Sequence, residues 1–302
     1  MRKLFNVLRN IFAILGVLFV VLIILLHTGV FEVNMGRSEK SALNSRIRAL
    51  KTSGPYVKDT MVFSINAVRD SVRAAEIRGY FCLDTLYDAS APTWDKAVAI
   101  ARFVADNIPH ANQKIQPEKR NAIALWEYTR NVEPGINCRL HSIMLFEMLT
   151  SVGIDATYVT CLPKKEDGDC HVVNQVWLPE LGKWVMIDSD SGGYYATDVD
   201  GNLLSLREIR ENYVSGAPVV YHPGFGEAGE SVGSWYFAYM AKNTYWFAVW
   251  ENIHYDQESG LWGSNDGRYL VLIPSGYEPF SMGTDVVPTS DADRFWAAPE
   301  LK

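Results

Sequence analysis

Residues 171–188 read HVVNQVWLPELGKWVMID, and this stretch predicts a β-hairpin with a polar residue at each end. Its first seven and last six residues are rich in β-branched and aromatic side chains, which is typical of strands. Between them, residues 178–182 supply a proline and a glycine suited to a turn. The midpoint between His171 and Asp188 falls inside that turn. We therefore expect these two residues to lie directly opposite each other, with Cβ atoms roughly 4.5–5.5 Å apart.

The segment from Gly135 to Val152 predicts a helix with a cysteine in its first turn. Its apolar residues recur at helical spacing, and Gly153 follows at the position where glycine commonly ends a helix. Asn137 is a favoured residue for the N-cap, which places Cys138 in the first turn. There the helix dipole favours a thiolate, and unpaired backbone N–H groups can bind an oxyanion.

Cys138, His171 and Asp188 together have the chemistry of an acyl-transfer triad: a thiol nucleophile, an imidazole base and a carboxylate that orients the base. Taken singly, each has an ordinary structural explanation, as a small buried apolar residue, a surface histidine and a strand-end aspartate. Their joint placement, at a helix start and at the ends of two paired strands, favours the catalytic interpretation. His141, on the same helix, lacks a carboxylate partner in the sequence, so we expect it to have a structural role.

Composition limits the classes of protein that this chain can belong to. Of its 302 residues, 48% are hydrophobic and 12% aromatic, enough to form a sizeable core. The formal net charge is −7, and no basic stripe indicates a nucleic-acid partner. No Cys-x-x-Cys pair indicates zinc, so we expect no metal and no cofactor.

The N-terminus predicts a membrane anchor. Ile11 to Leu26 contains no polar side chain, and the uncharged stretch over 10–31 is long enough to span a bilayer. Three basic residues precede it, which places the N-terminus in the cytoplasm and the rest of the chain in the periplasm or outside the cell. A cleaved signal peptide is the alternative, but no convincing cleavage site follows.

The chain is therefore expected to have five parts. They are a cytoplasmic tail at 1–9, the transmembrane anchor at 10–31, a helical N-terminal region at 32–91 with helices at 41–50 and 61–78, a catalytic core at 92–215, and an aromatic-rich β-type C-terminal extension at 216–302 packed on the core.

Two features of the expected exported part remain open. Aromatic residues between Trp235 and Tyr255 could form an exposed platform for glycans or peptides, but so dense an apolar run is more typical of packing on a core. Cys161 and Cys170 flank a polar turn and could form a disulfide, or they could remain two unlinked thiols.

Three blocks of sequence resemble the transglutaminase-like superfamily: Gly135-x-x-Cys138 with the helix after it, the strand that begins at His171, and Trp184-x-x-x-Asp188. The resemblance covers about residues 92–215. It implies an α+β, papain-like fold in which the nucleophile helix packs on an antiparallel sheet, preceded here by helices and the anchor.

The same resemblance implies a function and a role for each residue. Cys138 would be the nucleophile, His171 the base that then protonates the leaving amine, and Asp188 the residue that fixes the imidazole tautomer. The reaction would be acyl transfer from a peptide or side-chain amide through a Cys thioester, with hydrolysis by a cysteine peptidase or amidase preferred. Protein-glutamine cross-linking is the first alternative, and a non-catalytic module that binds cell-envelope peptide or glycan is the second.

The second oxyanion donor is left open by the resemblance. Trp126, Asn137 and Gln175 are the candidates. Members of the family often have Trp at the place of Val173 and Glu at the place of Gln175, so this chain departs from the pattern beside the histidine.

Overall fold

A computed structural model describes most of the chain. The described residues are 30–63, 65–67, 70–165, 168–226, 234–259, 268–279 and 286–299. The chain divides into two units, Met1–Ser45 and Arg46–Lys302. The sheet, the helices packed on it and the candidate site all belong to the second unit.

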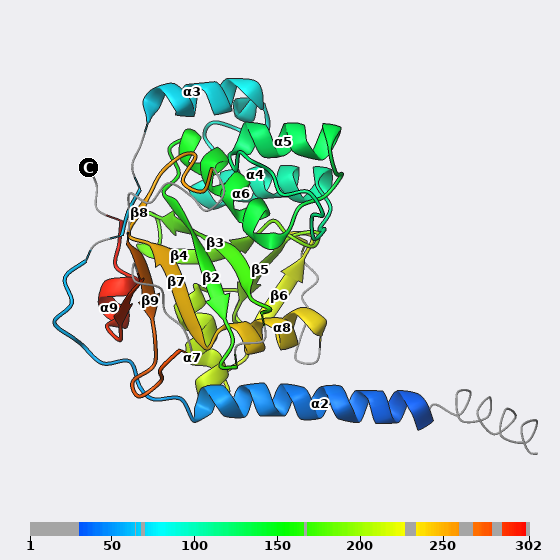
Figure 1. Cartoon of the computed structure of the whole chain (residues 1–302), viewed down its shortest axis with the longest axis vertical. Helices are drawn as coiled ribbons and strands as arrows, with labels where there is room; N and C mark the ends of the chain where they lie inside the picture. The colour runs from blue at the N-terminus through cyan, green and yellow to red at the C-terminus, as the bar shows by residue number, and fades with distance from the viewer. Residues whose placement is uncertain are drawn as a thin grey trace, which may run out of the picture. The chain divides into compact units, whose positions relative to one another are not determined.

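Helices and strands follow one another along the chain as Figure 1 shows. The helices are α2 (Val30–Lys51), α3 (Ser71–Tyr80), the short 3₁₀ helix η1 (Leu83–Thr85), α4 (Thr93–Asn107), α5 (Ala122–Asn131), α6 (Cys138–Ser151), α7 (Leu206–Ser215), α8 (Trp235–Asn243) and α9 (Ala292–Phe295). The strands are β1 (Asn66–Ala67), β2 (Ala156–Leu162), β3 (His171–Leu178), β4 (Lys183–Asp188), β5 (Tyr194–Thr197), β6 (Val220–Pro223), β7 (Trp246–Trp250), β8 (Asn252–Ile253), β9 (Tyr269–Leu272) and β10 (Val286–Thr289).

The main sheet has eight strands within the described residues, in the order β10-β9-β7-β2-β3-β4-β5-β6. Neighbouring strands are antiparallel except β9 and β10, which are parallel. The short strands β1 and β8 pair separately and in parallel. The predicted α+β class with a large antiparallel sheet is confirmed.

The two faces of β3 contact different helices, because side chains alternate along a strand. On one face, Asn174 Nδ2 donates to the backbone carbonyl of Ser142 in α6 over 2.9 Å. On the other face, the backbone N–H of Leu206 at the start of α7 donates to Gln175 Oε1 over 2.8 Å. Figure 1 shows α3 to α6 grouped at the top of the view and α7 and α8 at the bottom. The predicted packing of the nucleophile helix on the sheet is therefore present.

The pairing of β3 with β4 differs from the predicted register. Leu178 pairs with Lys183 across a four-residue turn in which Gly182 has φ +61°. This register places Asp188 two residues from the position opposite His171, because β3 continues to Leu178 and the turn starts later than expected. A shift of two positions keeps both side chains on the same face of the sheet.

The second predicted helix of the N-terminal region is shorter than expected. The sequence pattern predicted a helix over 61–78, but α3 begins at Ser71. The Asp70 side chain accepts hydrogen bonds from the backbone N–H groups of Val72 and Arg73, which marks it as the N-cap. The described residues between 61 and 70 are not helical, and two of them form β1.

The four cysteines are unlinked, so the disulfide left open by the sequence does not form in this structure. Cys161 pairs with His171 across β2 and β3. Cys170 is therefore one residue out of register with Cys161, and consecutive side chains on a strand point to opposite faces.

The C-terminal residues extend the same sheet. Strands β6, β7, β9 and β10 come from residues after 215. The packing role predicted for the aromatic cluster is confirmed for Tyr236, Phe237 and Phe247, which are at most 5% exposed. Trp235 is 54% exposed, and its segment is helix α8 instead of a strand.

The described part of the chain contains no helix with the length and apolarity needed to cross a bilayer. The predicted cytoplasmic tail at 1–9 and nearly all of the predicted anchor at 10–31 lie outside the described residues. The structure gives the anchor no support, and it stays a prediction.

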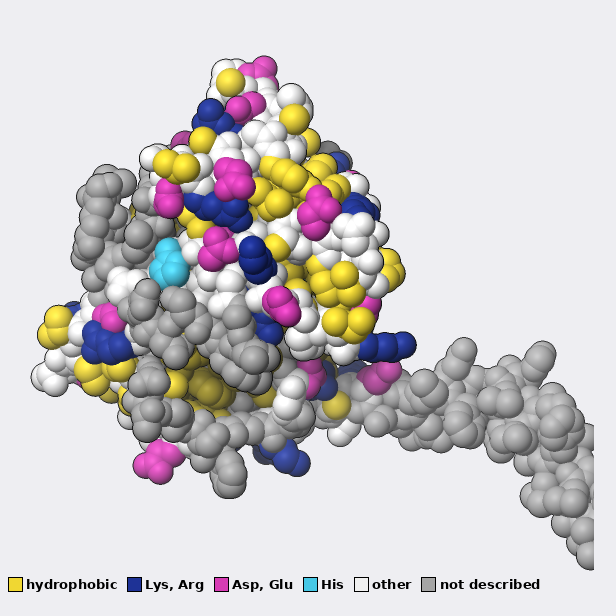
Figure 2. All heavy atoms as spheres, turned by 45° about the horizontal axis from the view of Figure 1, so that its top comes forward, with side chains coloured by type: hydrophobic (Ala, Val, Ile, Leu, Met, Phe, Trp, Pro, Cys, Tyr) yellow, Lys and Arg dark blue, Asp and Glu magenta, His cyan; other side chains and the backbone are white. Residues whose placement is uncertain are grey.

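Acidic and basic side chains are interspersed on the face of the molecule shown in Figure 2. Apolar side chains lie between them in several small groups. Mixed charge of this kind is typical of a solvated surface.

Helix α6 is held in place by a buried carboxylate in its middle. Glu147 is 1% exposed. Its Oε2 accepts from the backbone N–H of Ala122 at the start of α5 over 2.7 Å, and its Oε1 accepts from that of Asp256 over 2.8 Å. Burial raises the pKa of Glu147 to about 7, although these hydrogen bonds oppose the rise.

We expect Glu147→Gln to remove a pH-dependent part of the stability. Because the folded pKa lies above the ordinary 4.5, folding favours the protonated form. The resulting stabilisation is complete below about pH 4.5 and is lost as the pH rises through about 7. The loss is at most roughly 3 kcal/mol at 1.36 kcal/mol per pKa unit. Urea unfolding at a series of pH values measures it, with the exposed Glu278→Gln as control. Equal pH slopes for wild type and Glu147→Gln would refute the assignment.

Candidate active site

Cys138 is the first residue of α6, as the sequence predicted. Asn137 is the N-cap in extended conformation, and its Oδ1 accepts from the backbone N–H of Leu140 over 3.2 Å. The N–H groups of a first helical turn have no intrahelical acceptor. The backbone N–H of Cys138 is therefore placed to bind an oxyanion beside its own sulfur.

His171 and Asp188 make the predicted contact, although the strand register differs. His171 begins β3 and Asp188 ends β4, and Nε2 of the imidazole lies 2.7 Å from Oδ2 of the carboxylate. Both side chains are buried, at 3% and 0% exposure. Diagonal neighbours on one face of an antiparallel pair lie within reach of long side chains. The contact thus requires that His171 and Asp188 lie on the same face of the sheet, and it does not require that they pair directly across β3 and β4.

Asp188 accepts two further hydrogen bonds. Its Oδ2 accepts from the hydroxyl of Tyr236 over 2.6 Å, and its Oδ1 accepts from the backbone N–H of Asp190 over 2.8 Å. Tyr236 stacks on Tyr194 with ring centroids 3.7 Å apart. These contacts satisfy a carboxylate that is cut off from water and hold it in one orientation toward His171.

The charge on His171 follows from its neighbours. Burial by itself lowers the pKa of His171, but the Asp188 carboxylate and a hydrogen bond with Cys138 outweigh burial. Together they hold the pKa of His171 well above its usual range. A positively charged imidazole therefore lies beside the sulfur of Cys138.

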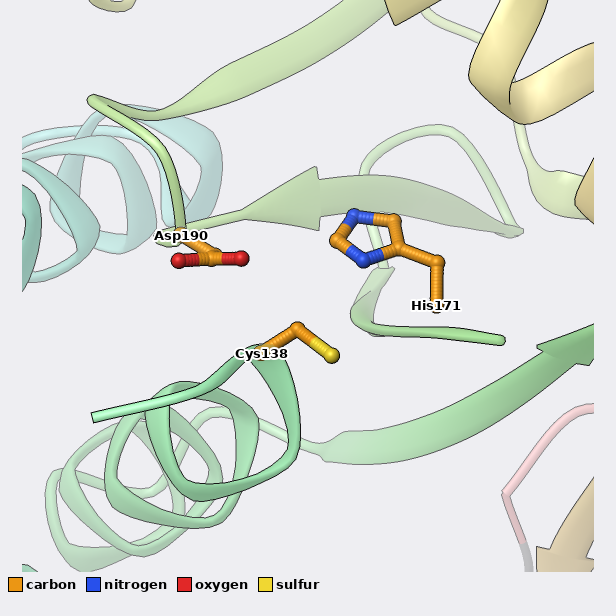
Figure 3. A group of neighbouring side chains, drawn as sticks. All are labelled: Cys138, His171 and Asp190. Atoms are coloured by element: carbon orange, nitrogen blue, oxygen red, sulfur yellow. The ribbon is translucent and has the colours of Figure 1, made fainter. Parts of the chain in front are cut away.

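A second carboxylate, from Asp190, lies at the same place and was not predicted as a site residue. Figure 3 shows the side chains of Cys138, His171 and Asp190 converging from three segments. The sulfur, a ring nitrogen and a carboxylate oxygen all lie within 4.8 Å of one another. The one signal for Asp190 in the sequence is that a second aspartate follows Asp188 at a spacing of two residues.

Asp190 is itself paired with a histidine from a distant loop. His110 Nδ1 lies 2.9 Å from Oδ1 and 3.0 Å from Oδ2 of Asp190. This hydrogen bond raises the pKa of His110. Burial raises the pKa of Asp190, but the hydrogen bond from His110 and the nearby histidines outweigh it, so the pKa is lowered. The pair therefore favours an imidazolium and a carboxylate beside the sulfur.

His141 is fully buried, as the predicted structural role requires. His141 nevertheless has a carboxylate nearby, contrary to the expectation from the sequence, because its Nε2 lies 3.6 Å from Oδ1 of Asp190. Burial lowers the pKa of His141, which favours its neutral form.

Two of the three candidates for the second oxyanion donor have structural contacts elsewhere. Trp126 stacks on Phe103 with centroids 5.5 Å apart and carries the Arg130 guanidinium over its ring. Gln175, four residues along β3 from the histidine, accepts through Oε1 from the backbone N–H of Leu206 at the start of α7. Asn137 is adjacent to Cys138, with its side-chain oxygen used in the N-cap.

Comparison with known proteins identifies the domain that carries this site. Residues 83–189 match the family model of the transglutaminase-like superfamily. No curated protein matches the chain. Among solved structures, it is similar to a candidate cysteine protease from Cytophaga hutchinsonii, with 13% identity and a TM-score of 0.32 over 53% of this chain and 49% of that chain. It is also similar to a candidate protease from Parabacteroides distasonis ATCC 8503, with 16% identity and a TM-score of 0.26 over 49% of this chain and 26% of that chain.

The chain thus spans about half of the first of these proteins and about a quarter of the second. The family match begins at 83 and ends at 189, whereas the sequence motifs suggested about 92–215. Residues 83–189 of this chain form a transglutaminase-like domain.

Proposed function

We propose that the chain is a thiol enzyme that hydrolyses peptide or side-chain amides through a thioester on Cys138. The observation that carries this proposal is the buried contact of His171 with Asp188, 2.7 Å long, beside a cysteine at a helix N-terminus. The match to a transglutaminase-like domain supports the same chemistry.

In this mechanism the Cys138 thiolate attacks the amide carbonyl, and the backbone N–H of Cys138 stabilises the oxyanion that forms. The His171 imidazolium donates its proton to the leaving amine, and the C–N bond breaks to leave a thioester. His171, now neutral, takes a proton from a water molecule that attacks the thioester. Collapse of the second tetrahedral intermediate releases the carboxylic acid and restores the thiolate–imidazolium pair.

Asp188 acts through His171. Its hydrogen bond to Nε2 leaves Nδ1 directed to the sulfur and stabilises the imidazolium. Water is proposed as the acceptor by analogy with peptidases that use the same triad. An amine acceptor would use the same three residues and give cross-linking, so only the reaction products separate the two reactions.

We expect the full-length chain to cleave or deamidate members of a glutamine-containing peptide library, with the same products when a primary amine is added. Mass spectrometry of the products measures this. Cys138→Ala should give no product, because it removes the nucleophile. Cys82→Ala, which alters an exposed cysteine, should match wild type. Amine conjugated to peptide would favour transglutaminase activity. If no product depends on Cys138, the result would favour the non-catalytic binding module.

We expect Asp188→Asn to lower kcat by roughly 10³–10⁴-fold, because the amide stabilises the wrong imidazole tautomer. The alkaline limb of the pH–rate profile should also move to lower pH, since the carboxylate that raises the pKa of His171 is gone. Steady-state kinetics from pH 5 to 10 test both, with the exposed Asp84→Asn as control. An unchanged alkaline limb would argue against a catalytic imidazolium.

We also propose that residues 10–31 anchor the enzyme, with residues 32–302 on the non-cytoplasmic side. The apolar run from Ile11 to Leu26 and the basic residues before it support this. In sealed membranes, the full-length chain should resist alkaline extraction, and protease added to the non-cytoplasmic side should digest it. A chain lacking residues 1–31 should be released. Alkaline extraction of the intact chain would contradict the anchor.

A further inference from the structure

Asp190 has no part in the proposed acyl-transfer mechanism, yet it is 2% exposed beside the nucleophile. Its carboxylate, the Cys138 sulfur and a His171 ring nitrogen lie within 4.8 Å of one another (Figure 3). They come from the turn after β4, the start of α6 and the start of β3.

Thiolate, imidazole and carboxylate are the ligand types that Zn²⁺ binds. Bond lengths of about 2.0–2.3 Å place the ligand atoms of a tetrahedral zinc site roughly 3.3–3.8 Å apart. The three atoms here, within 4.8 Å, reach that spacing with shifts of about 1 Å or less. Cys138 is half-buried, so an ion can enter from solvent on its side.

The surrounding contacts orient two of these ligands for a metal ion. The Asp188 carboxylate is hydrogen-bonded to Nε2 of His171, which leaves Nδ1 on the side of the sulfur. Carboxylate–histidine contacts of this kind recur behind metal-binding histidines. Asp190 is held in turn by Nδ1 of His110. Each carboxylate oxygen retains a lone pair beyond that hydrogen bond.

We propose that Cys138, His171 and Asp190 form a regulatory Zn²⁺ site that blocks the nucleophile. On binding, any protons on the sulfur and on Nδ1 of the imidazole pass to solvent, and three protein–metal bonds form. Water occupies the fourth position. The sulfur lone pair that would attack an amide is then bound to the metal. The inhibitory effect rests on the proposed function, whereas the binding does not.

The binding test titrates the full-length chain with Zn²⁺ against a chromophoric chelator. Wild type should bind one Zn²⁺ at this site. Cys138→Ala and Asp190→Asn should each weaken binding at least tenfold, because each removes a ligand atom. Asp188→Asn should weaken Zn²⁺ binding by about 10–100-fold, because Asp188 orients the ligand His171 without itself contacting the metal. Cys82→Ala should leave the affinity unchanged. An Asp190→Asn chain that binds as tightly as wild type would overturn the proposal.

A second measurement needs no variant. Saturating Zn²⁺ should lower the rate of iodoacetamide labelling at Cys138 in the wild-type chain at least tenfold, as followed by peptide mass spectrometry, and removal of the metal by chelator should restore it. Unchanged labelling would overturn the proposal. If the chain binds Zn²⁺ and the metal protects Cys138 from iodoacetamide, but the chain hydrolyses no amide, the proposed enzyme is refuted and the metal site is retained. Turnover undiminished by saturating Zn²⁺ would overturn the metal site and leave the enzyme standing.

Discussion

The buried carboxylate of Asp188 is the constraint on which the rest of this site depends. An ionised carboxylate that is 0% exposed is stable only when hydrogen bonds and opposite charge replace the water it has lost. His171, Tyr236 and the backbone N–H of Asp190 supply them. Each of these donors comes from a different segment, so satisfying one carboxylate brings β3, α8 and the turn after β4 to one place.

This constraint makes the C-terminal residues part of the site. Tyr236 lies beyond residue 215, in α8, and donates to the carboxylate that orients the imidazole. Strand β7 extends the sheet next to β2, whose Cys161 pairs with His171. Residues after 215 therefore support the geometry of the site in two ways, through the hydrogen bond of Tyr236 and through β7, which pairs with the strand next to β3.

Two carboxylates at one site have separate environments. Asp188 is bound by His171 and Tyr236, and Asp190 is bound by His110. The first orients the proposed base. The second lies within 4.8 Å of the sulfur, where it completes the proposed set of three metal-ligand atoms. The proposed acyl-transfer chemistry and the proposed metal site thus share Cys138 and His171 and differ in the aspartate they use.

Local sequence by itself determined the helix at Cys138, the strands of the β3–β4 hairpin and the face on which His171 and Asp188 lie. N-capping, helical spacing and the two-residue alternation of strands act within a few residues. The predicted register of β3 and β4 was wrong by two positions, but a shift of two positions leaves His171 and Asp188 on the same face. Tertiary structure alone decided that His110, 80 residues from Asp190, and Tyr236, 48 residues from Asp188, complete the site. No local pattern specifies those partners, because buried carboxylates take their donors from whichever segments the packed core brings within reach.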